Sequence, residues 1–362
     1  MKILCFTDTL TQGGAERQLV NIAVGLADKG YEVHFLILYD GSFFKEQLKN
    51  KNIHLVCMNS RYRLLSFLKV RKYLRSKSFD VVLSFLYLPA LFSVFSLFPS
   101  RKFKLVIGER SCDIRDLNNP VRRFFKFFYL CADKVVANSF ESVNLFRKTV
   151  PFVKDTFCQV IYNILYAKDW IPVSYPDFNG FYRIVVLASY EKQKNILRLL
   201  ESLLYLSEEE RMRIHIDWYG KVKNIQLYRC SLDYIEKYGL SKNISLHQEL
   251  HDVKLVMNDA HFLGLFSVSE SLPNAVCEGM MLAKPIIAAR ISDVPLLLDE
   301  NSNFLCDPFD VKSIAFAIKK ALCTSVYELE RFGRYNRMRA LSIFDNNKAI
   351  NLYDSLFKDI CK

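Results

Sequence analysis

One stretch of the sequence, SVSESLPNAVCEGMMLAKP at residues 267–285, decides the fold and contains two glutamates eight positions apart. Glu270 comes just before Pro273, which fixes its own φ and disfavours helix at the residue before it. We therefore predict that Glu270 lies on a loop and Glu278 on the helix that follows. The start of that helix has unpaired backbone N–H groups and a positive dipole end, so it suits a phosphate or sugar hydroxyls. Taken alone, the paired glutamates also fit an ordinary solvated turn.

The residues around these glutamates resemble the pattern of the family 4 retaining glycosyltransferases, which have the GT-B fold of two Rossmann-like domains facing a cleft. The spacing E-x7-E is accompanied by Ser267, Pro273, Asn274, Gly279, Lys284 and Pro285. The resemblance implies that Glu278 holds the ribose hydroxyls of a nucleotide-sugar and that Glu270 lies beside the transferred sugar. It also implies that Leu272, Pro273 and Asn274 line the donor site. Ser271 stands where the family usually has glycine, so some freedom of the turn is lost.

Length and composition indicate a two-domain globular protein. A chain of 362 residues is too long for one core, and 51% apolar with 24% charged residues excludes a disordered chain. None of the ten cysteines forms a C-x-x-C motif, so neither a zinc site nor a disulfide framework is indicated. The first residues, MKILCFTDTL, lack the pattern of a secretory signal. We therefore expect a cytoplasmic protein.

The positive charge of the chain is concentrated in its first half. Residues 1–164 hold 25 Lys and Arg against 13 Asp and Glu, whereas the rest of the chain is balanced at 25 each. Basic and apolar residues interleave at 61–77, where we predict an amphipathic helix, and again at 122–128. We expect these stretches to bind an anionic membrane surface peripherally, although a nucleic-acid surface or a plain solvated face are the alternatives.

Twenty uncharged residues, at 81–100, are long enough to cross a bilayer. They begin with the strand-like VVLSF and contain Pro89, which we expect to break the run. We therefore predict a buried parallel strand that leads into a helix, and no transmembrane segment.

The first domain opens with a strand at 2–7, the pair Gly13-Gly14, a helix, and a strand at 32–38. This is a Rossmann-like order, but G-x-G-x-x-G is missing, so a dinucleotide enzyme is disfavoured. The resemblance implies that Gly13 and Gly14 face the donor diphosphate. A plain turn is the alternative.

A second element of the first domain, Gly108-Glu109-Arg110-Ser111, resembles one that faces the acceptor in relatives acting on lipid-linked sugars. Arg110 is therefore a candidate for the acceptor phosphate, with a structural Glu109–Arg110 ion pair as the alternative. Many relatives also place a histidine near the reaction centre, and residues 84–88 offer none.

The second domain is predicted to begin after an interdomain linker at 165–180 that contains two prolines and no periodicity. A strand then ends at Leu187, and a helix starts near Lys194, where a lysine can reach a phosphate. The resemblance implies that Lys194 neutralises the leaving diphosphate, but Ser189 stands where the family has arginine. It also implies that Gln248 lies where the nucleobase binds.

Together these features predict an α/β protein of the GT-B class. We expect domains at 1–164, to which the last helix at 344–362 returns, and at 181–343. The predicted function is transfer of a sugar from a nucleotide-sugar to a polyprenyl-diphosphate-linked glycan at the cytoplasmic face of the membrane, as in capsule or O-antigen synthesis. The alternatives are a nucleotide-sugar 2-epimerase and a basic membrane or nucleic-acid binding protein with an inactive donor pocket. No metal, no cofactor and no nucleic-acid partner is expected.

Overall fold

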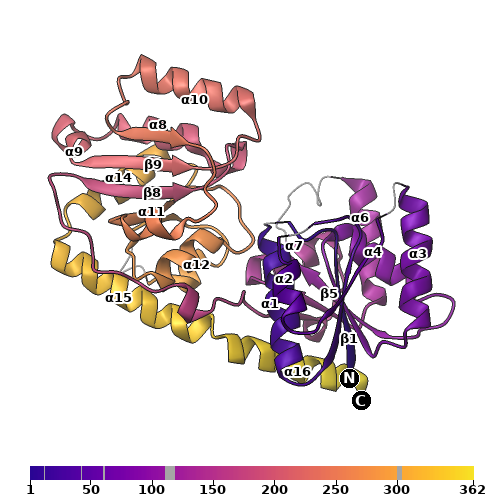
Figure 1. Ribbon diagram of the computed structural model, residues 1–362. Coiled ribbons are helices and arrows are strands. Elements are labelled where there is room, and N and C mark those ends of the chain that lie inside the picture. The colour runs from indigo at the N-terminus through magenta and orange to yellow at the C-terminus, as the bar shows by residue number, and fades with distance from the viewer. Residues whose placement is uncertain (12, 42, 60–61, 111–118, 300–303) are drawn as a thin grey trace. The chain divides into compact units, whose positions relative to one another are not determined.

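The structure, a computed structural model, describes residues 1–11, 13–41, 43–59, 62–110, 119–299 and 304–362. The chain divides into two compact units, each built on a parallel sheet (Figure 1). The first unit comprises Met1–Ile164 and Phe344–Lys362, and the second comprises Leu165–Ile343. Residues 165–180, the predicted linker, therefore belong to the second unit. Arg61 and Ser111, which two predicted motifs include, lie outside the described residues.

The first unit has a seven-stranded sheet in the order β3-β2-β1-β4-β5-β6-β7, and every pair is parallel. Its strands are β1 (Lys2–Thr7), β2 (Glu32–Ile37), β3 (His54–Cys57), β4 (Val81–Phe85), β5 (Lys104–Glu109), β6 (Lys134–Ala137) and β7 (Cys158–Val160). Its helices are α1 (Gly14–Asp28), α2 (Lys45–Lys49), α3 (Arg63–Ser76), α4 (Tyr87–Ser96), α6 (Pro120–Phe127), α7 (Phe140–Thr149) and α16 (Asn346–Cys361). The strand order reverses between β1 and β4, which is where open α/β sheets bind ligands.

The last helix, α16, packs against α1 in the first unit, as predicted for the end of the chain. A side chain at Gly25 would meet the Ile350 side chain at 2.5 Å, so the glycine allows the close approach of the two helices. The Asp354 carboxylate accepts hydrogen bonds from Lys29, at 3.3 Å, and from the hydroxyl of Tyr31. These contacts fix α16 to the first unit.

The long uncharged run forms β4 and α4, and most of its side chains are buried. The run divides into a strand and a helix as predicted, but the break lies at Leu86 and not at Pro89. Pro89 lies in the first turn of α4, where a proline removes no intrahelical hydrogen bond, and the helix continues to Ser96. No helix in the described ranges is both long and apolar enough to span a membrane.

The second unit has a six-stranded parallel sheet in the order β10-β9-β8-β11-β12-β13. Its strands are β8 (Tyr182–Leu187), β9 (Ile214–Tyr219), β10 (Ile244–His247), β11 (Phe262–Leu265), β12 (Ile286–Ala289) and β13 (Phe304–Cys306). Its helices are α8 (Ile196–Leu203), α9 (Glu208–Met212), α10 (Ile225–Lys237), α11 (Lys254–Asn258), α12 (Asn274–Met281), α13 (Val294–Leu297), α14 (Val311–Leu322) and α15 (Val326–Ile343). Here the order reverses between β8 and β11.

Candidate active site

The candidate active site lies in the second unit, at the carboxyl ends of β8 and β11. These strands are neighbours at the point where the strand order reverses. The loop after β8 carries Lys194, and the loop after β11 carries Glu270. Parallel strands bring the loops that follow them to one edge of the sheet, so residues far apart in the sequence meet there.

Lys194 and Glu270 form an ion pair at this edge. The Lys194 Nζ lies 2.5 Å from the Glu270 Oε1, and the hydroxyl of Ser267 donates to the same oxygen over 2.8 Å. The two charged side chains are only 17% and 16% exposed. A lysine has three N–H donors, so Lys194 can hold Glu270 and still offer donors to an anionic ligand.

The two loops are also joined through their backbones and through Asn195. The backbone N–H of Val268 donates to the carbonyl of Gln193 over 2.8 Å. Asn195 is buried and has a φ of 68°, a left-handed conformation that asparagine tolerates better than most residues. Its amide donates to the carbonyls of Phe266 at 3.0 Å and Pro308 at 2.8 Å. These contacts fix the position of Lys194 relative to Glu270.

The helix α12 begins directly after the Glu270 loop, as predicted. Pro273 is its N-cap and makes no side-chain cap, and its carbonyl accepts from the backbone N–H groups of Val276 at 3.1 Å and Cys277 at 3.2 Å. Asn274 opens the helix, and Glu278 follows one turn later on the same side, with 6% of its surface exposed. Leu272 and Pro273 are buried beneath this junction.

Two other residues of the motif serve the fold. A side chain at Gly279 would lie 3.0 Å from atoms of Leu263 and Ile286, so the glycine lets α12 pack closely on β11 and β12. Lys284 is 1% exposed, and its ammonium donates to the carbonyls of Asn258 and Ala260 at 2.5 and 2.9 Å. Burial lowers the pKa of Lys284 to about 8.

Ser189 occupies the position where the resemblance implies an arginine, and it is hydrogen-bonded to a carboxylate that also binds a lysine. Its hydroxyl donates to the Glu191 carboxylate over 2.6 Å, and the same oxygen lies 3.1 Å from the Lys223 Nζ. Glu191 thus brings a cation from the loop after β9 to the loop that carries Lys194. Lys223 is thus held close to Ser189 by the carboxylate of Glu191.

Tyr190 connects the loop that carries Lys194 to the carboxyl ends of β9 and β10. Its ring is fully buried, and its hydroxyl contacts the carbonyls of Trp218 at 3.1 Å and His247 at 2.8 Å. His247 ends β10, and the exposed Gln248 follows it. The structure therefore links the Lys194 loop to the segment where the resemblance implies nucleobase binding.

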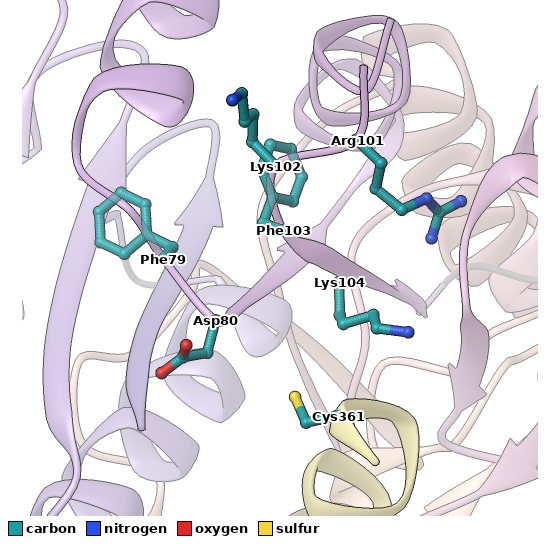
Figure 2. A pocket seen from close by; sticks show the side chains of 7 residues that line it. All are labelled: Phe79, Asp80, Arg101, Lys102, Phe103, Lys104 and Cys361. Atoms are coloured by element: carbon teal, nitrogen blue, oxygen red, sulfur yellow. The ribbon is translucent and has the colours of Figure 1, made fainter.

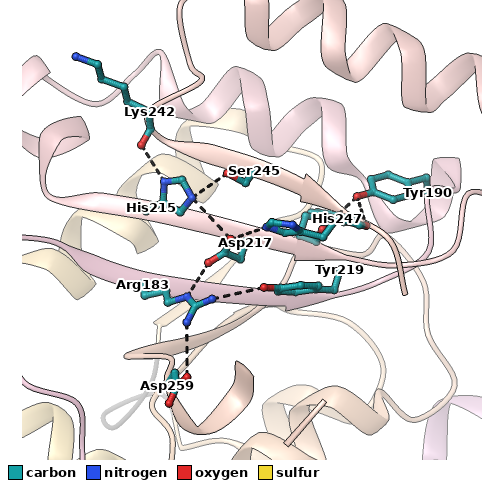
Figure 3. A network of polar contacts seen from close by, with 10 residues as sticks. Arg183, Tyr190, His215, Asp217, Tyr219, Lys242, Ser245, His247 and Asp259 are labelled. Atoms are coloured by element: carbon teal, nitrogen blue, oxygen red, sulfur yellow. Dashed lines mark hydrogen bonds and ion pairs between the residues drawn. The ribbon is translucent and has the colours of Figure 1, made fainter. Parts of the chain in front are cut away.

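A polar network lies on β8, β9 and β10, with Asp217 at its centre (Figure 3). The Asp217 carboxylate is bound by Arg183 at 2.6 Å and by His247 at 2.7 Å. Burial alone would raise its pKa, but hydrogen bonds from His215, Arg183 and His247 hold the pKa of Asp217 well below its usual value. The His247 ring also stacks on Tyr219 at 4.4 Å. The network therefore fixes the orientation of His247.

In the first unit, the predicted glycine pair lies at the start of α1. Gly13 is its N-cap and Gly14 its first residue. A side chain at Gly13 would lie 2.0 Å from the Glu16 Oε2, so the group that approaches this glycine is a carboxylate of the same chain. Burial raises the pKa of Glu16, and hydrogen bonds from its own backbone N–H and from Thr9 partly oppose the shift.

Asp8 follows β1 at the point where the strand order of the first unit reverses. Burial, and then the charge of Glu16, raise the pKa of Asp8 to about 6. Its Oδ1 and the hydroxyl of the preceding Thr7 are buried and have no hydrogen-bond partner among the described residues. Neither residue was singled out from the sequence.

Arg110 lies at the end of β5 and does not pair with Glu109. Its guanidinium donates to the hydroxyl of Tyr353 at 2.6 Å and to Asn163 at 3.2 Å, and it lies 4.3 Å from the centre of the Phe85 ring. Glu109 instead pairs with Lys126 at 2.8 Å, and both side chains are at most 10% exposed. The alternative of a Glu109–Arg110 ion pair is therefore not what the structure contains.

The first unit also contains a cavity of about 380 Å³ at the amino ends of β4 and β5 (Figure 2). Its lining residues are Phe79, Asp80, Arg101, Lys102, Phe103, Lys104 and Cys361. None of the predicted site residues lines it. Within the described ranges, no cluster of three or more His, Cys, Asp and Glu side chains is arranged to hold a metal ion.

The structure thus brings Lys194 and Glu270 together and places Asn274 and Glu278 on the adjoining helix. Ser189 and Gln248 lie on neighbouring loops of the same unit, whereas Gly13, Gly14 and Arg110 belong to the first unit. Sequence reasoning did not identify Asn195 and Tyr190 as the residues that position the loops. The sequence signal for Asn195 was its place next to Lys194 at a helix start.

Comparisons with known proteins agree with this architecture. A family model described as Glycosyltransferase Family 4 matches residues 12–165, and one described as Glycosyl transferases group 1 matches residues 172–339. Over 292 residues, 77% of each chain, the protein is 26% identical to a GalNAc-alpha-(1->4)-GalNAc-alpha-(1->3)-diNAcBac-PP-undecaprenol alpha-1,4-N-acetyl-D-galactosaminyltransferase of Campylobacter jejuni.

Solved structures show the same fold. HepE of Anabaena, in complex with UDP and glucose, aligns with a TM-score of 0.83 at 17% identity over 99% of this chain and 100% of that one. Sucrose-phosphate synthase of Thermosynechococcus elongatus aligns with a TM-score of 0.81 at 14% identity over 99% and 98%. The predicted GT-B fold is therefore confirmed. Because the two family models between them cover most of the sequence, the chain belongs to the family 4 glycosyltransferases of the GT-B fold.

Proposed function

We propose that this glycosyltransferase takes its sugar from a nucleotide-sugar bound to the second unit and transfers it, with retention of configuration, to a polyprenyl-diphosphate-linked glycan. The observation that carries the proposal is the Lys194–Glu270 pair at the switch point, directly beside the start of α12. A cation and an acceptor carboxylate beside the positive end of a helix match a diphosphate joined to a sugar.

The residues have separate roles in this proposal. Lys194 neutralises the charge that grows on the departing diphosphate, with backbone N–H groups of α12 as further donors, so that the reaction proceeds without a metal. Glu278 accepts hydrogen bonds from the ribose hydroxyls, and Asn274, Leu272 and Pro273 shape the floor of the site. Glu270 faces the hydroxyls of the transferred sugar.

Two observations support UDP as the nucleotide and a lipid-linked acceptor. Structures of HepE, which shares the fold, contain UDP and UDP-glucose. The name of the Campylobacter jejuni relative describes an undecaprenol diphosphate carrying a short glycan as its acceptor. We expect Arg110, which already lies on the Phe85 ring, to bind a phosphate of such an acceptor. A role in capsule or O-antigen synthesis, at the cytoplasmic face of the membrane, fits this acceptor.

The proposal is tested by incubating the protein with a panel of nucleotide-sugars, with and without a polyprenyl-diphosphate glycan, and following products by mass spectrometry. We expect a lengthened lipid-linked glycan with one UDP-sugar. A donor that is converted to its 2-epimer without glycan extension would show the epimerase alternative instead.

Glu278→Gln should weaken binding of UDP about tenfold or more in calorimetry, because a charged acceptor for ribose hydroxyls contributes about 1.5 to 3 kcal/mol. Glu236→Gln, on the exposed side of α10, is the matched control and should bind UDP normally. Equal affinity of the two variants would remove Glu278 from the ribose site.

A further inference from the structure

The helix α6 turns its apolar side outward. Val121, Phe124 and Phe127 are 61%, 60% and 39% exposed, while the only fully buried side chain of the helix is Lys126, which pairs with Glu109. A surface helix normally turns its apolar stripe to the core and its charges to water. In α6 three apolar side chains face solvent while a lysine is buried, so its outer face fits an apolar partner.

The helix α3 shows the same feature next to unpaired cations. Leu64, Leu65 and Leu68 are 70%, 49% and 51% exposed. At 100° per residue, these leucines and the exposed Lys69 and Lys72 share one side of the helix, within an arc of about 140°. In the described part of the chain, neither lysine side chain has a hydrogen bond or an ion pair. The inner side of α3 is formed by Ser66, Val70 and Leu74.

Not every cation of α3 belongs to this outer side. Arg71 donates to the carbonyl of Phe95 at 2.7 Å, and Arg75 donates to those of Ser96 at 3.1 Å and Ser100 at 2.8 Å. These two arginines satisfy carbonyls at and beyond the end of α4. Our sequence interpretation grouped all the basic residues of this helix together, and the structure separates Arg71 and Arg75, which serve the fold, from Lys69 and Lys72, which face solvent beside the leucines.

The two helices belong to one layer of the first unit, with α4 between them (Figure 1). The rings of Phe67 on α3 and Phe92 on α4 are 5.5 Å apart, and those of Phe95 on α4 and Phe125 on α6 are 6.5 Å apart. The exposed apolar residues of α3 and α6 therefore flank one helix.

We propose that the exposed faces of α3 and α6, formed by Leu64, Leu65, Leu68, Lys69, Lys72, Val121, Phe124 and Phe127, are a docking surface for an anionic lipid bilayer. Charge complementarity selects this occupant. Lys69 and Lys72 lie beside the exposed leucines, and neither residues 47–79 nor residues 117–132 contain an acid that would repel an anionic headgroup. Leucine and phenylalanine enter the acyl boundary of a bilayer while lysines reach its phosphates, and neither signal alone gives stable binding.

Single-stranded nucleic acid fits this surface less well. Its bases bind by stacking on aromatic rings, and the exposed apolar residues of α3 are leucines, which offer no ring. The surface is independent of the proposed reaction, because binding to vesicles needs no donor, and donor binding by the second unit needs no vesicles. Failure of either proposal can therefore be recognised without the other.

The test is sedimentation of the full chain with vesicles of two parts phosphatidylcholine to one part phosphatidylglycerol, at low and at high salt. We expect the wild type to sediment with these vesicles at low salt, and at least ten times less with pure phosphatidylcholine. The triple variant Leu65→Gln, Leu68→Gln, Phe124→Gln and the double variant Lys69→Glu, Lys72→Glu should each lose about tenfold or more in partitioning.

Matched controls come from the second unit. Leu255→Gln, Phe316→Gln and Tyr327→Gln replace side chains that are 72%, 68% and 72% exposed. Lys242→Glu with Lys320→Glu makes the same change in charge at exposed positions. Both controls should bind vesicles like the wild type. All variants replace exposed residues, and unchanged circular dichroism and UDP affinity show that each is folded.

Three results would overturn the proposal. One is equal binding to charged and neutral vesicles, and another is binding that the α3 and α6 variants leave unchanged. The third is a wild type that does not bind vesicles. It would instead form a dimer that the triple variant abolishes, or bind single-stranded RNA with strong salt dependence.

Discussion

The Nζ of Lys194 lies 2.5 Å from the Oε1 of Glu270, although 76 positions separate the two residues in the sequence. The cation that we assign to the leaving diphosphate is therefore already paired with a carboxylate. We expect a bound diphosphate to share Lys194 with Glu270, and this sharing to set the balance between donor affinity and turnover.

Glu270→Gln should bind UDP more tightly than the wild type while transferring sugar more slowly. Removal of the carboxylate leaves the charge of Lys194 for the diphosphate, and an ion pair of partly exposed side chains contributes about 1 kcal/mol, or about fivefold in affinity. Turnover should fall because a hydrogen-bond acceptor for the transferred sugar is weakened. Calorimetry and initial rates measure the two effects. Weaker UDP binding in Glu270→Gln would mean that the carboxylate itself supports the nucleotide.

Asn195 should determine both stability and turnover. In Asn195→Ala, the carbonyls of Phe266 and Pro308 lose their donor, at a cost of about 2 to 4 kcal/mol in the free energy of unfolding. Asn195→Gly should cost about 1 kcal/mol less, because glycine adopts the left-handed conformation without strain. Turnover should fall in both variants, since the Lys194 loop loses its anchor. Wild-type turnover in the glycine variant would show that Asn195 serves the fold alone.

The raised pKa of Asp8 makes the stability of the first unit depend on pH. The pKa of Asp8 is about 6 in the folded protein, whereas an unperturbed aspartate has a pKa of 3.8. Between these pH values the folded state therefore binds more protons than the unfolded state. Stability contributed by this group is therefore lost as pH rises from about 4 to about 6. Asp8→Asn should gain about 2 to 3 kcal/mol relative to the wild type between about pH 4 and about pH 8.

Urea unfolding at the two pH values measures this difference for Asp8→Asn. Asp155→Asn, at an exposed position of the same unit, is the control and should show no such change. A constant difference between Asp8→Asn and the wild type would mean that Asp8 titrates normally.

Short stretches of the sequence were sufficient to predict the elements that carry the candidate site. Pro273 between two glutamates correctly predicts a loop followed by α12, and the apolar run that ends at Leu187 predicts β8. A resemblance over several motifs also gave the fold class. These predictions succeed because turn chemistry and buried parallel strands depend on residues that are adjacent in the sequence.

Contacts between distant residues were not predictable in this way. The partner of Glu109 is Lys126 rather than the adjacent Arg110, and Arg71 satisfies carbonyls of another helix. The helical period at 120–127 shows that α6 has two faces but not which one points outward. That choice depends on the buried acid at the end of β5, which only the folded chain places beneath the helix.

The central claim, that Lys194 stabilises the leaving diphosphate, is tested most directly by steady-state kinetics of Lys194→Met with the UDP-sugar donor. Charge on the diphosphate grows toward the transition state, so kcat should fall at least a hundredfold while KM for the donor changes little, a loss of about 3 kcal/mol or more. Lys192→Met, an exposed lysine two residues earlier, should keep the kcat of the wild type. An unchanged kcat with a raised KM for Lys194→Met would contradict the account, because Lys194 would then only bind the ground state.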